Sequence, residues 1–585
     1  MTLTIITTNT TVGVFLPAAG DGLIVSPTGT IIATGSVIDG RDATGQFVSI
    51  AGYVDIGFLW LGGQNNINIA SGGVFNGHSR DTSIFVGDNG NFSVVTGGTT
   101  LNNHGAIFAD HNAIKLFGTS NVINNTGDIS ANIQAIEVGL LGSFDAVTNS
   151  GTISSGSGDA VNLSGFFDSV SNSGQISSVA GSGVDMLGDS NSLVNTGTIT
   201  SLQATAIQAI GGTNLITNLG SIAANHGIAI QMGDHGQLVN SGTINGTDNA
   251  IVADNLAASI RITNSGSITS MLNIAIDLTA GIGTSHMTNS GIVQGAVASY
   301  IGSGDTDIVV NSGTMIGNVA LGAGNDTFDG RGGTVTGAVD GGTGSDAYFV
   351  DSASLVLFEQ LNPGETDSVF SEVSYRLGIN LENLTLLNAG NLNGAGNLSA
   401  NVITGNAGDN RLNGSDGNDT LNGDVGNDRL NGGNQNDSLV GGDGDDTLAG
   451  QQGNDRLEGG DGDDVLTGGL GKDVMIGGTG QDVFVFATVA QSGNTAATAD
   501  VIVDFTKGDD LINLAAIDAN RGNATANDAF TFIGSAVFTG VAGQLHYVQT
   551  AGNTFVEMDV NGDGIADSVI QLNGLILLNA GDFIL

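Results

Sequence analysis

The sequence predicts an all-β fold: a right-handed parallel β-helix of about 23 residues per coil, then a parallel β-roll of shorter period, then a β-rich C-terminal domain. An Asn-X-Gly motif recurs through the first half, and a nine-residue unit recurs over residues 405–485. Helical periodicity is missing throughout. The 96 glycines with only 3 prolines exclude collagen, and the 40% apolar content supplies a core that a disordered acidic chain lacks.

The Asn-X-Gly repeat sets the coil length of the predicted β-helix. Its glycines are Gly105, Gly127, Gly151, Gly174, Gly197, Gly220, Gly242, Gly266, Gly291 and Gly313. An asparagine stands two positions before each glycine, from Asn103 to Asn311. Two further β-branched apolar pulses per repeat predict three short strands in each coil. Because stacked coils lie about 4.8 Å apart, we expect the asparagines to form a ladder of amide hydrogen bonds.

The repeats divide the sequence into four predicted segments. These are the β-helix solenoid at 1–319, a connector with two irregular repeat units at 320–404, the nine-residue repeats at 405–485, and the C-terminal domain at 486–585.

The charge balance limits the partners that we expect. There are 57 acidic and 12 basic residues, a formal net charge of −45, which repels phosphate backbones and anionic lipid. No stretch approaches the roughly 18 uninterrupted apolar residues of a membrane-spanning helix. We therefore expect neither nucleic-acid binding nor membrane insertion. The chain has no cysteine, so metal sites would use oxygen ligands, and cations are the expected partners.

The nine-residue unit has a fixed pattern of glycine, acid and apolar residue. The units begin at Gly405, Gly414, Gly423, Gly432, Gly441, Gly450, Gly459, Gly468 and Gly477. Position six holds Asn410, Asp419, Asp428, Asp437, Asp446, Asp455, Asp464, Asp473 and Asp482. Position eight is always apolar, from Leu412 to Phe484. Two units make a coil of eighteen residues, so alternate position-six residues stack on the same edge.

This spacing predicts a series of calcium sites. Six residues of glycine-rich turn let backbone carbonyls approach a cation, the aspartate supplies charge, and Ca²⁺ prefers six to eight oxygen ligands. Residues 405–485 hold 16 acidic and 4 basic side chains, a difference of −12. In-register carboxylates repel one another without cations, so we expect the roll to fold only where calcium is abundant. Magnesium suits such a site less well. The alternative is a plain solenoid with solvated acidic turns.

At these repeats the chain resembles the RTX (repeats-in-toxin) family, and the following segment resembles the C-terminal domain of serralysin-type (peptidase M10) metalloproteases. The segment's matching residues include Asp500-Val-Ile-Val-Asp504-Phe505 and the terminal Asp582-Phe-Ile-Leu585. The resemblance implies a secreted, extracellular protein whose C-terminus is read by a type I secretion apparatus. Met1 to Gly20 contains no lysine or arginine, so we do not expect a conventional N-terminal signal. The zinc motif His-Glu-X-X-His of the protease domain is absent.

Further cation ligands are predicted outside the regular repeats. Asp326 and Asp346, twenty residues apart, resemble position six of degenerate RTX units. Asp559, Asn561 and Asp563 alternate as at the start of an EF-hand-type loop. Asp567 would then replace the usual glutamate, because Ile570 stands at position twelve of that loop. A turn between two strands is the alternative for this segment.

Two functions remain open from the sequence. We expect a non-enzymatic extracellular scaffold, such as a surface, matrix or adhesin-like protein, with a polysaccharide or a cell surface as partner. The alternative is a polysaccharide-modifying lyase or epimerase with its active site on the β-helix, because β-helix plus RTX repeats resembles the layout of secreted alginate epimerases. No acid/base cluster identifies a catalytic residue.

Overall fold

The computed structural model describes the chain apart from residues 1–2, 7–8, 11–13, 16–20, 33–35, 41–44, 57, 62–63, 78–81, 87–97, 139–142, 255–256 and 523–527. It comprises two compact units, Met1–Gly342 and Thr343–Leu585. Strands dominate both units, and the described residues include one short 3₁₀-helix, η1 (Ala580–Asp582). No helix in the described part of the chain has the length and apolar character needed to cross a membrane.

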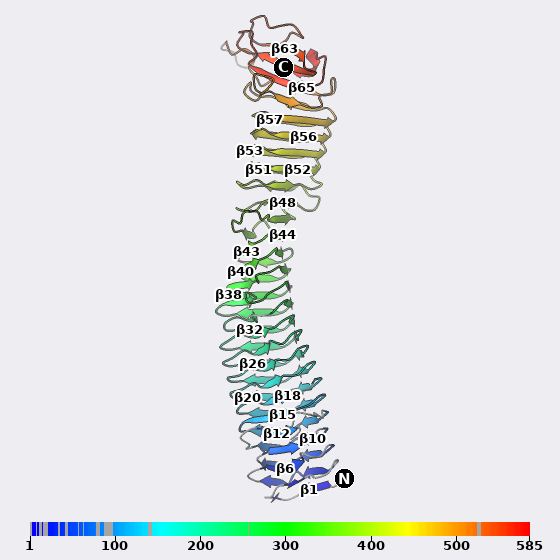
Figure 1. The fold of residues 1–585 in the computed structure, drawn as a ribbon, viewed down its shortest axis with the longest axis vertical. Coiled ribbons are helices and arrows are strands. Elements are labelled where there is room, and N and C mark those ends of the chain that lie inside the picture. Colours follow the sequence, from blue (N-terminus) through cyan, green and yellow to red (C-terminus); the bar gives the residue numbers. More distant parts are fainter. Residues whose placement is uncertain are drawn as a thin grey trace. The chain divides into compact units, whose positions relative to one another are not determined.

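The first unit is a parallel β-helix with three strands in each regular coil, as predicted (Figure 1). The first strands of the coils are β1 (Leu3–Ile6), β4 (Gly22–Val25), β7 (Phe47–Ile50), β10 (Asn66–Ile69), β13 (Thr100–Asn103), β16 (Val122–Asn125), β19 (Ala146–Asn149), β22 (Ser169–Asn172), β25 (Ser192–Asn195), β28 (Leu215–Asn218), β31 (Gln237–Asn240), β34 (Arg261–Asn264), β37 (Ser285–Asn289), β39 (Asp307–Asn311) and β41 (Thr327–Asp329).

The second strands are β2 (Asn9–Thr10), β5 (Thr30–Ile32), β8 (Tyr53–Ile56), β11 (Val74–Gly77), β14 (Ala106–Ala109), β17 (Asp128–Ala131), β20 (Thr152–Ser155), β23 (Gln175–Ser178), β26 (Thr198–Ser201), β29 (Ser221–Ala224), β32 (Thr243–Gly246), β35 (Ser267–Ser270) and β42 (Thr334–Val335). The third strands are β3 (Val14–Phe15), β6 (Ser36–Gly40), β9 (Phe58–Leu61), β12 (Thr82–Val86), β15 (Asn112–Leu116), β18 (Ile136–Val138), β21 (Val161–Leu163), β24 (Val184–Met186), β27 (Ile207–Ala209), β30 (Ile230–Met232), β33 (Ile251–Ala253), β36 (Ile274–Asp277) and β43 (Ala338–Thr343). In two late coils the second and third strands are continuous, as β38 (Ile292–Ile301) and β40 (Thr314–Ala323).

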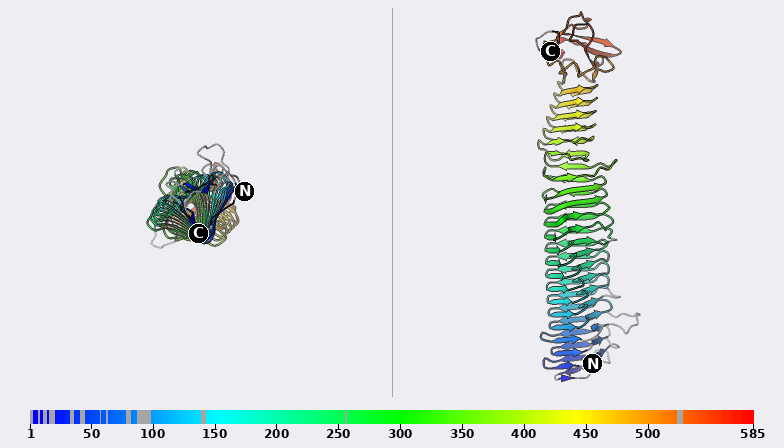
Figure 2. Two further views of the ribbon diagram at one scale, coloured as in Figure 1. Left: turned by 90° about the horizontal axis from the view of Figure 1, so that it is seen from below. Right: turned by 90° about the vertical axis from the view of Figure 1, so that its left-hand side faces the viewer.

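Equivalent strands of successive coils are stacked on one another (Figure 2). They pair in parallel and in register, so each side chain lies above its counterpart one coil away. Ile153 therefore pairs with Ile176 and Ile176 with Ile199, and all three are fully buried. The predicted asparagine ladder is confirmed. Each Nδ2 from Asn103 to Asn289 donates to Oδ1 of the next asparagine at 2.7–2.8 Å, ending at Asn311.

The second unit begins with shorter strands and continues into the roll. The strands before the roll are β44 (Ala347–Val350), β45 (Val356–Phe358), β46 (Ser368–Ser371), β47 (Tyr375–Arg376), β48 (Asn383–Leu386), β49 (Asn393–Ala395) and β50 (Val402–Thr404). The roll strands are β51 (Arg411–Asp416), β52 (Thr420–Val425), β53 (Arg429–Asn434), β54 (Ser438–Asp443), β55 (Thr447–Gln452), β56 (Arg456–Asp461), β57 (Val465–Leu470), β58 (Val474–Thr479) and β59 (Val483–Val485).

Roll strands pair with the strand eighteen residues away, which forms two facing parallel sheets. Odd-numbered strands β51 to β59 make one sheet, and β52 to β58 belong to the other. Position eight of every unit points between them, and each of these side chains is at most 2% exposed, from Leu412 to Phe484. Burying one apolar residue per nine gives the roll a thin core.

The C-terminal strands close the second unit. They are β60 (Asp500–Ile502), β61 (Leu511–Asn513), β62 (Thr531–Phe532), β63 (Gln544–Thr550), β64 (Asn553–Asp559), β65 (Ser568–Asn573) and β66 (Phe583–Ile584). β60 pairs with β58, and β61 pairs with β59, so both continue the roll sheets. β63, β64 and β65 form an antiparallel meander whose last strand pairs with β60.

Candidate calcium-binding site

The turns between the roll strands place the position-six aspartates in two rows, which run from coil to coil along the roll. Each strand begins directly after its aspartate, so that β55 follows Asp446 and β57 follows Asp464. One row holds Asn410, Asp428, Asp446, Asp464 and Asp482, and the other holds Asp419, Asp437, Asp455 and Asp473. The predicted division into two edges is thus reproduced by the strand register.

A ladder of hydrogen bonds runs along each row of aspartates. In the first row, the backbone N–H of each residue donates to Oδ1 of the aspartate one coil later, at 2.6 Å from Asn410 to Asp428 and 2.7 Å from Asp446 to Asp464. In the second row the corresponding distances are 2.8–2.9 Å from Asp419 to Asp473. One oxygen of each carboxylate therefore fixes the stacking of two coils.

The other carboxylate oxygen has no such partner. Among the described residues, no donor reaches the buried Oδ2 atoms of Asp419, Asp428, Asp437, Asp446, Asp455, Asp464, Asp473 and Asp482. All eight residues are at most 3% exposed. A buried carboxylate oxygen without a hydrogen bond costs free energy, because its hydration is lost and not replaced. A row of such oxygens is the ligand type that Ca²⁺ prefers.

Burial raises the pKa of these carboxyl groups. The pKa is raised to about 7 for Asp437, Asp446, Asp464 and Asp473, and to about 6 for Asp419, Asp428, Asp455 and Asp482. Desolvation is the largest cause, the accepted N–H lowers the pKa, and neighbouring aspartates raise it. A cation between the coils would favour the charged form of every one of these groups.

The position-one glycines leave space for these oxygens. A Cβ on Gly441 would lie 2.2 Å from Asp446 Oδ2 and 2.5 Å from the carbonyl oxygen of Gly459. The same closeness to Oδ2, 2.2–2.3 Å, occurs at Gly414, Gly423, Gly432, Gly441, Gly450, Gly459, Gly468 and Gly477. Position one therefore requires glycine because the carboxylate lies against its Cα, so these predicted site residues shape the cavity around the ligand atoms.

Asn410 differs from the aspartates in its row. Its Oδ1 accepts from the N–H of Asn406 at 2.7 Å, and its Nδ2 donates to Asn406 Oδ1 and to the carbonyl of Leu392. Its side-chain amide is thus satisfied within the protein at the first turn of the roll. Calcium ligation by Asn410 remains a prediction.

Two carboxylates extend the rows beyond the regular repeats. Oδ1 of Asp500 accepts from the N–H of Asp473 at 2.9 Å, and Oδ1 of Asp510 accepts from the N–H of Asp482 at 3.1 Å. The spacing is 27 and 28 residues instead of eighteen, so periodicity did not reveal them. The local pattern of aspartate followed by two apolar residues, Asp500-Val-Ile and Asp510-Leu-Ile, was the available signal.

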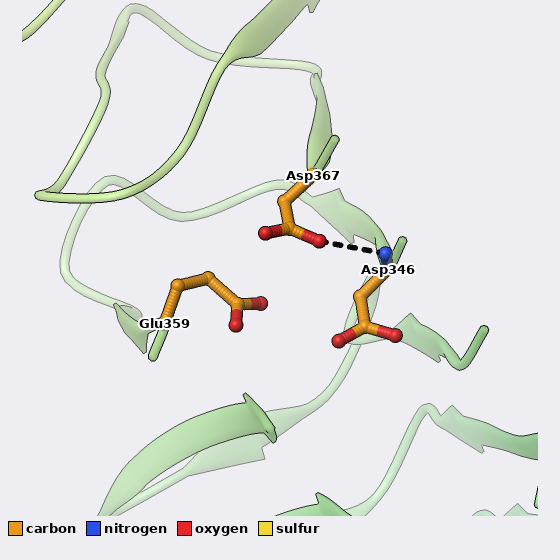
Figure 3. A group of neighbouring side chains, drawn as sticks. All are labelled: Asp346, Glu359 and Asp367. Atoms are coloured by element: carbon orange, nitrogen blue, oxygen red, sulfur yellow. Dashed lines mark hydrogen bonds between the residues drawn. The ribbon is translucent and has the colours of Figure 1, made fainter. Parts of the chain in front are cut away.

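A separate carboxylate group surrounds Asp346 in the second unit (Figure 3). Oxygens of Asp346, Glu359 and Asp367 lie within 4.8 Å of one another, and all three residues are buried. Oδ1 of Asp367 accepts from the N–H of Asp346 at 2.8 Å, which repeats the ladder geometry of the roll. Burial raises the pKa of Asp367 to about 6. The sequence indicated only Asp346, because Glu359 and Asp367, which lie next to β45 and β46, are not separated from it by a regular repeat.

Asp326, another predicted ligand, lies in the first unit. Its Oδ1 accepts from the N–H of Asp307 on the preceding coil at 2.7 Å, which is the same ladder geometry.

The Asp559 loop joins the antiparallel strands β64 and β65. Both carboxylate oxygens of Asp559 accept backbone N–H groups of this loop, and Asp567 accepts from Val560 N and Asn561 Nδ2. Asn561 and Asp563 each accept an N–H two residues later. These bonds describe a turn; cation binding at Asp559, Asn561, Asp563 and Asp567 stays a prediction.

Models of known protein families match the part of the chain that contains the carboxylate rows. Residues 330–585 match the model "Peptidase M10 serralysin C terminal". Residues 319–335 match the RTX calcium-binding nonapeptide repeat. The C-terminal segment is a serralysin-type RTX domain. The RTX match includes Asp326, which confirms the resemblance of that segment to an RTX unit. No protease-domain model matched.

The RTX domain binds calcium, and its family indicates a type I secreted, extracellular protein. No curated protein sequence matched the chain. Among solved structures, the chain is similar to the R3 subunit of the mannuronan C5-epimerase AlgE6 of Azotobacter vinelandii, at 26% identity, covering 26% of this chain and 78% of that one, with a TM-score of 0.20. The R2 subunit of the same enzyme is 27% identical, with 26% and 88% covered and a TM-score of 0.20.

Proposed function

We propose that the protein is a non-enzymatic extracellular scaffold whose RTX roll, residues 405–485, folds on calcium after type I secretion. Residues 486–585 would act as the secretion domain, and the β-helix would associate with a cell surface or an extracellular matrix. The observation that carries the proposal is the row of buried Oδ2 atoms without donors, which spans the roll on both edges. We further propose Asp346, with Glu359 and Asp367, as an additional calcium site.

The calcium concentration would decide whether the roll folds. Without a cation, stacking eight buried carboxylates costs desolvation and mutual repulsion, and the thin core of one apolar residue per unit offsets little of that cost. A ligand that binds only the folded state stabilises it by mass action, by about 2.7 kcal/mol per site at a hundred times the dissociation constant. The roll would therefore remain unfolded at low calcium inside the cell and fold outside.

Thermal unfolding of the full chain tests the proposal. Circular dichroism in a chelator should show one strand-rich transition from the β-helix, and millimolar calcium should add strand signal and a second transition. Identical spectra and transitions in both conditions would contradict calcium-dependent folding. A magnesium sample controls for ionic strength, and it should resemble the chelated sample.

The surface of the β-helix supports a scaffold role. A groove of about 420 Å³ crosses the stacked second strands and is lined by hydroxyl, amide and small apolar residues, including Ser154, Ser177 and Thr200. No carboxylate or histidine lines it. Such a face offers many weak polar contacts along its length, which suits adhesion to a repetitive surface.

One observation favours the alternative function, a polysaccharide-modifying enzyme. Asp159 and Asp185 lie on neighbouring coils, and both approach Asn162 Nδ2 at 3.4 Å. Burial, and then the charge of Asp159, raises the pKa of Asp185 to about 7, a value suited to general acid/base work. Calcium-loaded protein should be screened against anionic polysaccharides beside an Asp185→Asn variant. Bond cleavage or changed uronate composition that Asp185→Asn abolishes would establish the enzyme.

A further inference from the structure

The second unit contains a groove whose charge is opposite to that of the chain. It has a volume of about 590 Å³ and lies where the segment around Val356 faces strands β47, β49 and β51. Arg376 and Arg411 line it, and none of the lining residues is acidic. The sequence has only 12 basic residues against 57 acidic ones. A groove with two arginines and no carboxylate therefore differs in charge from the rest of the chain.

Three arginines lie on strands of one sheet. Arg376 is on β47, and the strand register aligns it through Ala395 with Asn413 of β51. Arg411 is two residues earlier on β51 and pairs directly with Arg429 of β53. All three side chains are exposed. We call Arg376, Arg411 and Arg429 the arginine row.

No carboxylate among the described residues is paired with the arginine row. In the part of the chain that the structure describes, no carboxylate forms an ion pair or hydrogen bond with any of its three guanidinium groups. By contrast Arg456, on the opposite roll sheet, pairs with Glu458 at 2.8 Å. Arg411 and Arg429 face each other across strands about 4.8 Å apart, and like charges in that position destabilise a sheet. An external anion would remove this repulsion.

The other residues of the groove indicate which class of anion it would bind. Ser374, Asn393 and Asn413 add hydroxyl and amide groups that can pair with sugar hydroxyls, and Val356 supplies an apolar wall for the face of a sugar ring. Guanidinium groups bind carboxylates bidentately. Positive charges on the coils of β47, β51 and β53 suit a polymer with repeated carboxylates. The chain's net charge opposes this binding weakly, because screening limits it to about 8 Å at physiological salt.

We propose that this groove and the arginine row bind an acidic polysaccharide through its carboxylate groups. The proposal concerns a site separate from the carboxylate rows, and it goes beyond the scaffold function by naming the class of partner. Two other occupants of the groove are possible outcomes of the test. A phosphate polymer has the negative charge but no sugar rings, and a second copy of this chain would bind through its acidic turns.

Binding of short oligogalacturonates to the full chain in millimolar calcium provides the test. Calorimetry should show binding to the wild type, at least about tenfold weaker binding to Arg376→Gln and to Arg411→Gln, and unchanged binding to Arg456→Gln. Methyl-esterified oligomers, which keep the sugar and lose the charge, should bind at least about tenfold more weakly. Circular dichroism confirms that each variant folds, and Arg376→Gln lies outside the nine-residue repeats in case Arg411→Gln disturbs the roll.

Several outcomes would overturn the proposal. One is no binding to folded wild-type protein, and another is equal loss in Arg456→Gln. Binding that both groove variants retain would indicate calcium bridges to the acidic turns instead. Equally tight binding of polyphosphate would show a general anion site. Association of the chain with itself that the groove variants abolish would identify a second copy as the occupant.

Discussion

The backbone N–H of Asp446 donates a 2.7 Å hydrogen bond to Oδ1 of Asp464, one coil further along the roll. Oδ2 of Asp464 is buried, and no donor among the described residues reaches it. The two oxygens of one carboxylate thus have different environments: one sets the spacing of the coils, and the other is available to a cation. This division explains why the residue must be acidic rather than merely polar.

Substituting Asp446 by asparagine separates these two roles. An asparagine oxygen can still accept the N–H of Asp428, but the negative charge is lost. We expect Asp446→Asn to bind fewer calcium ions and to lower the melting temperature of the roll in calcium. In chelator the variant and the wild type should give the same spectrum, because the roll is unfolded in both. The exposed neighbour Asp445→Asn serves as control, and an equal effect there would contradict the assignment.

Adding a methyl group at Gly441 should displace the ligand oxygen. The new Cβ would lie 2.2 Å from Asp446 Oδ2, so either the carboxylate or the turn must move. We expect Gly441→Ala to weaken calcium binding at that turn at least about tenfold, or about 1.4 kcal/mol, measured by calcium titration. Gly390→Ala, where nothing lies within 4 Å of the added Cβ, should match wild type.

The raised pKa values predict opposite pH responses with and without calcium. Folding raises the pKa of Asp446 from 3.8 to about 7, so between these values the folded calcium-free roll binds more protons than the unfolded chain. Its stability should therefore increase as pH falls through this window and be lost as pH rises above about 7. Calcium competes with the protons, so calcium affinity should fall below about pH 6.

Circular dichroism and calcium titration across about pH 5 to 8 would measure both responses. A chelated sample with more strand signal from the roll at about pH 8 than at about pH 5 would contradict the predicted direction of the stability change. A calcium affinity that does not change with pH would contradict the predicted competition between calcium and protons.

The asparagine ladder should stabilise the β-helix independently of calcium. Asn195 accepts from Asn172 Nδ2 and donates to Asn218 Oδ1, each at 2.8 Å, and it is fully buried. Asn195→Ala leaves the buried Asn218 Oδ1 without its donor, which costs about 1–3 kcal/mol, whereas Asn172 Nδ2 keeps its bonds to the carbonyls of Gly174 and Thr198. Denaturant unfolding should show this loss equally in calcium and in chelator. Asn124→Ala, which removes a half-buried bond to Asn102, should cost less than about 1 kcal/mol.

Regular spacing made much of the fold predictable from the sequence. The interval of about 23 residues placed Asn103 to Asn311 in one ladder, and the interval of nine placed Asp428 and Asp446 on the same edge. In a parallel solenoid, residues one period apart are neighbours in space, so sequence distance translates directly into contact. The prediction was most successful wherever the period held.

The sequence by itself determined the all-β solenoid, the two rows of aspartates and the buried apolar column, because each depends on a constant repeat. Only the tertiary structure placed Asp500 and Asp510 at the end of those rows, gathered Glu359 and Asp367 around Asp346, and brought Arg376 and Arg411 to one groove. These neighbours are separated by loops of irregular length, and the path of a loop is set by how the coils pack rather than by counting residues.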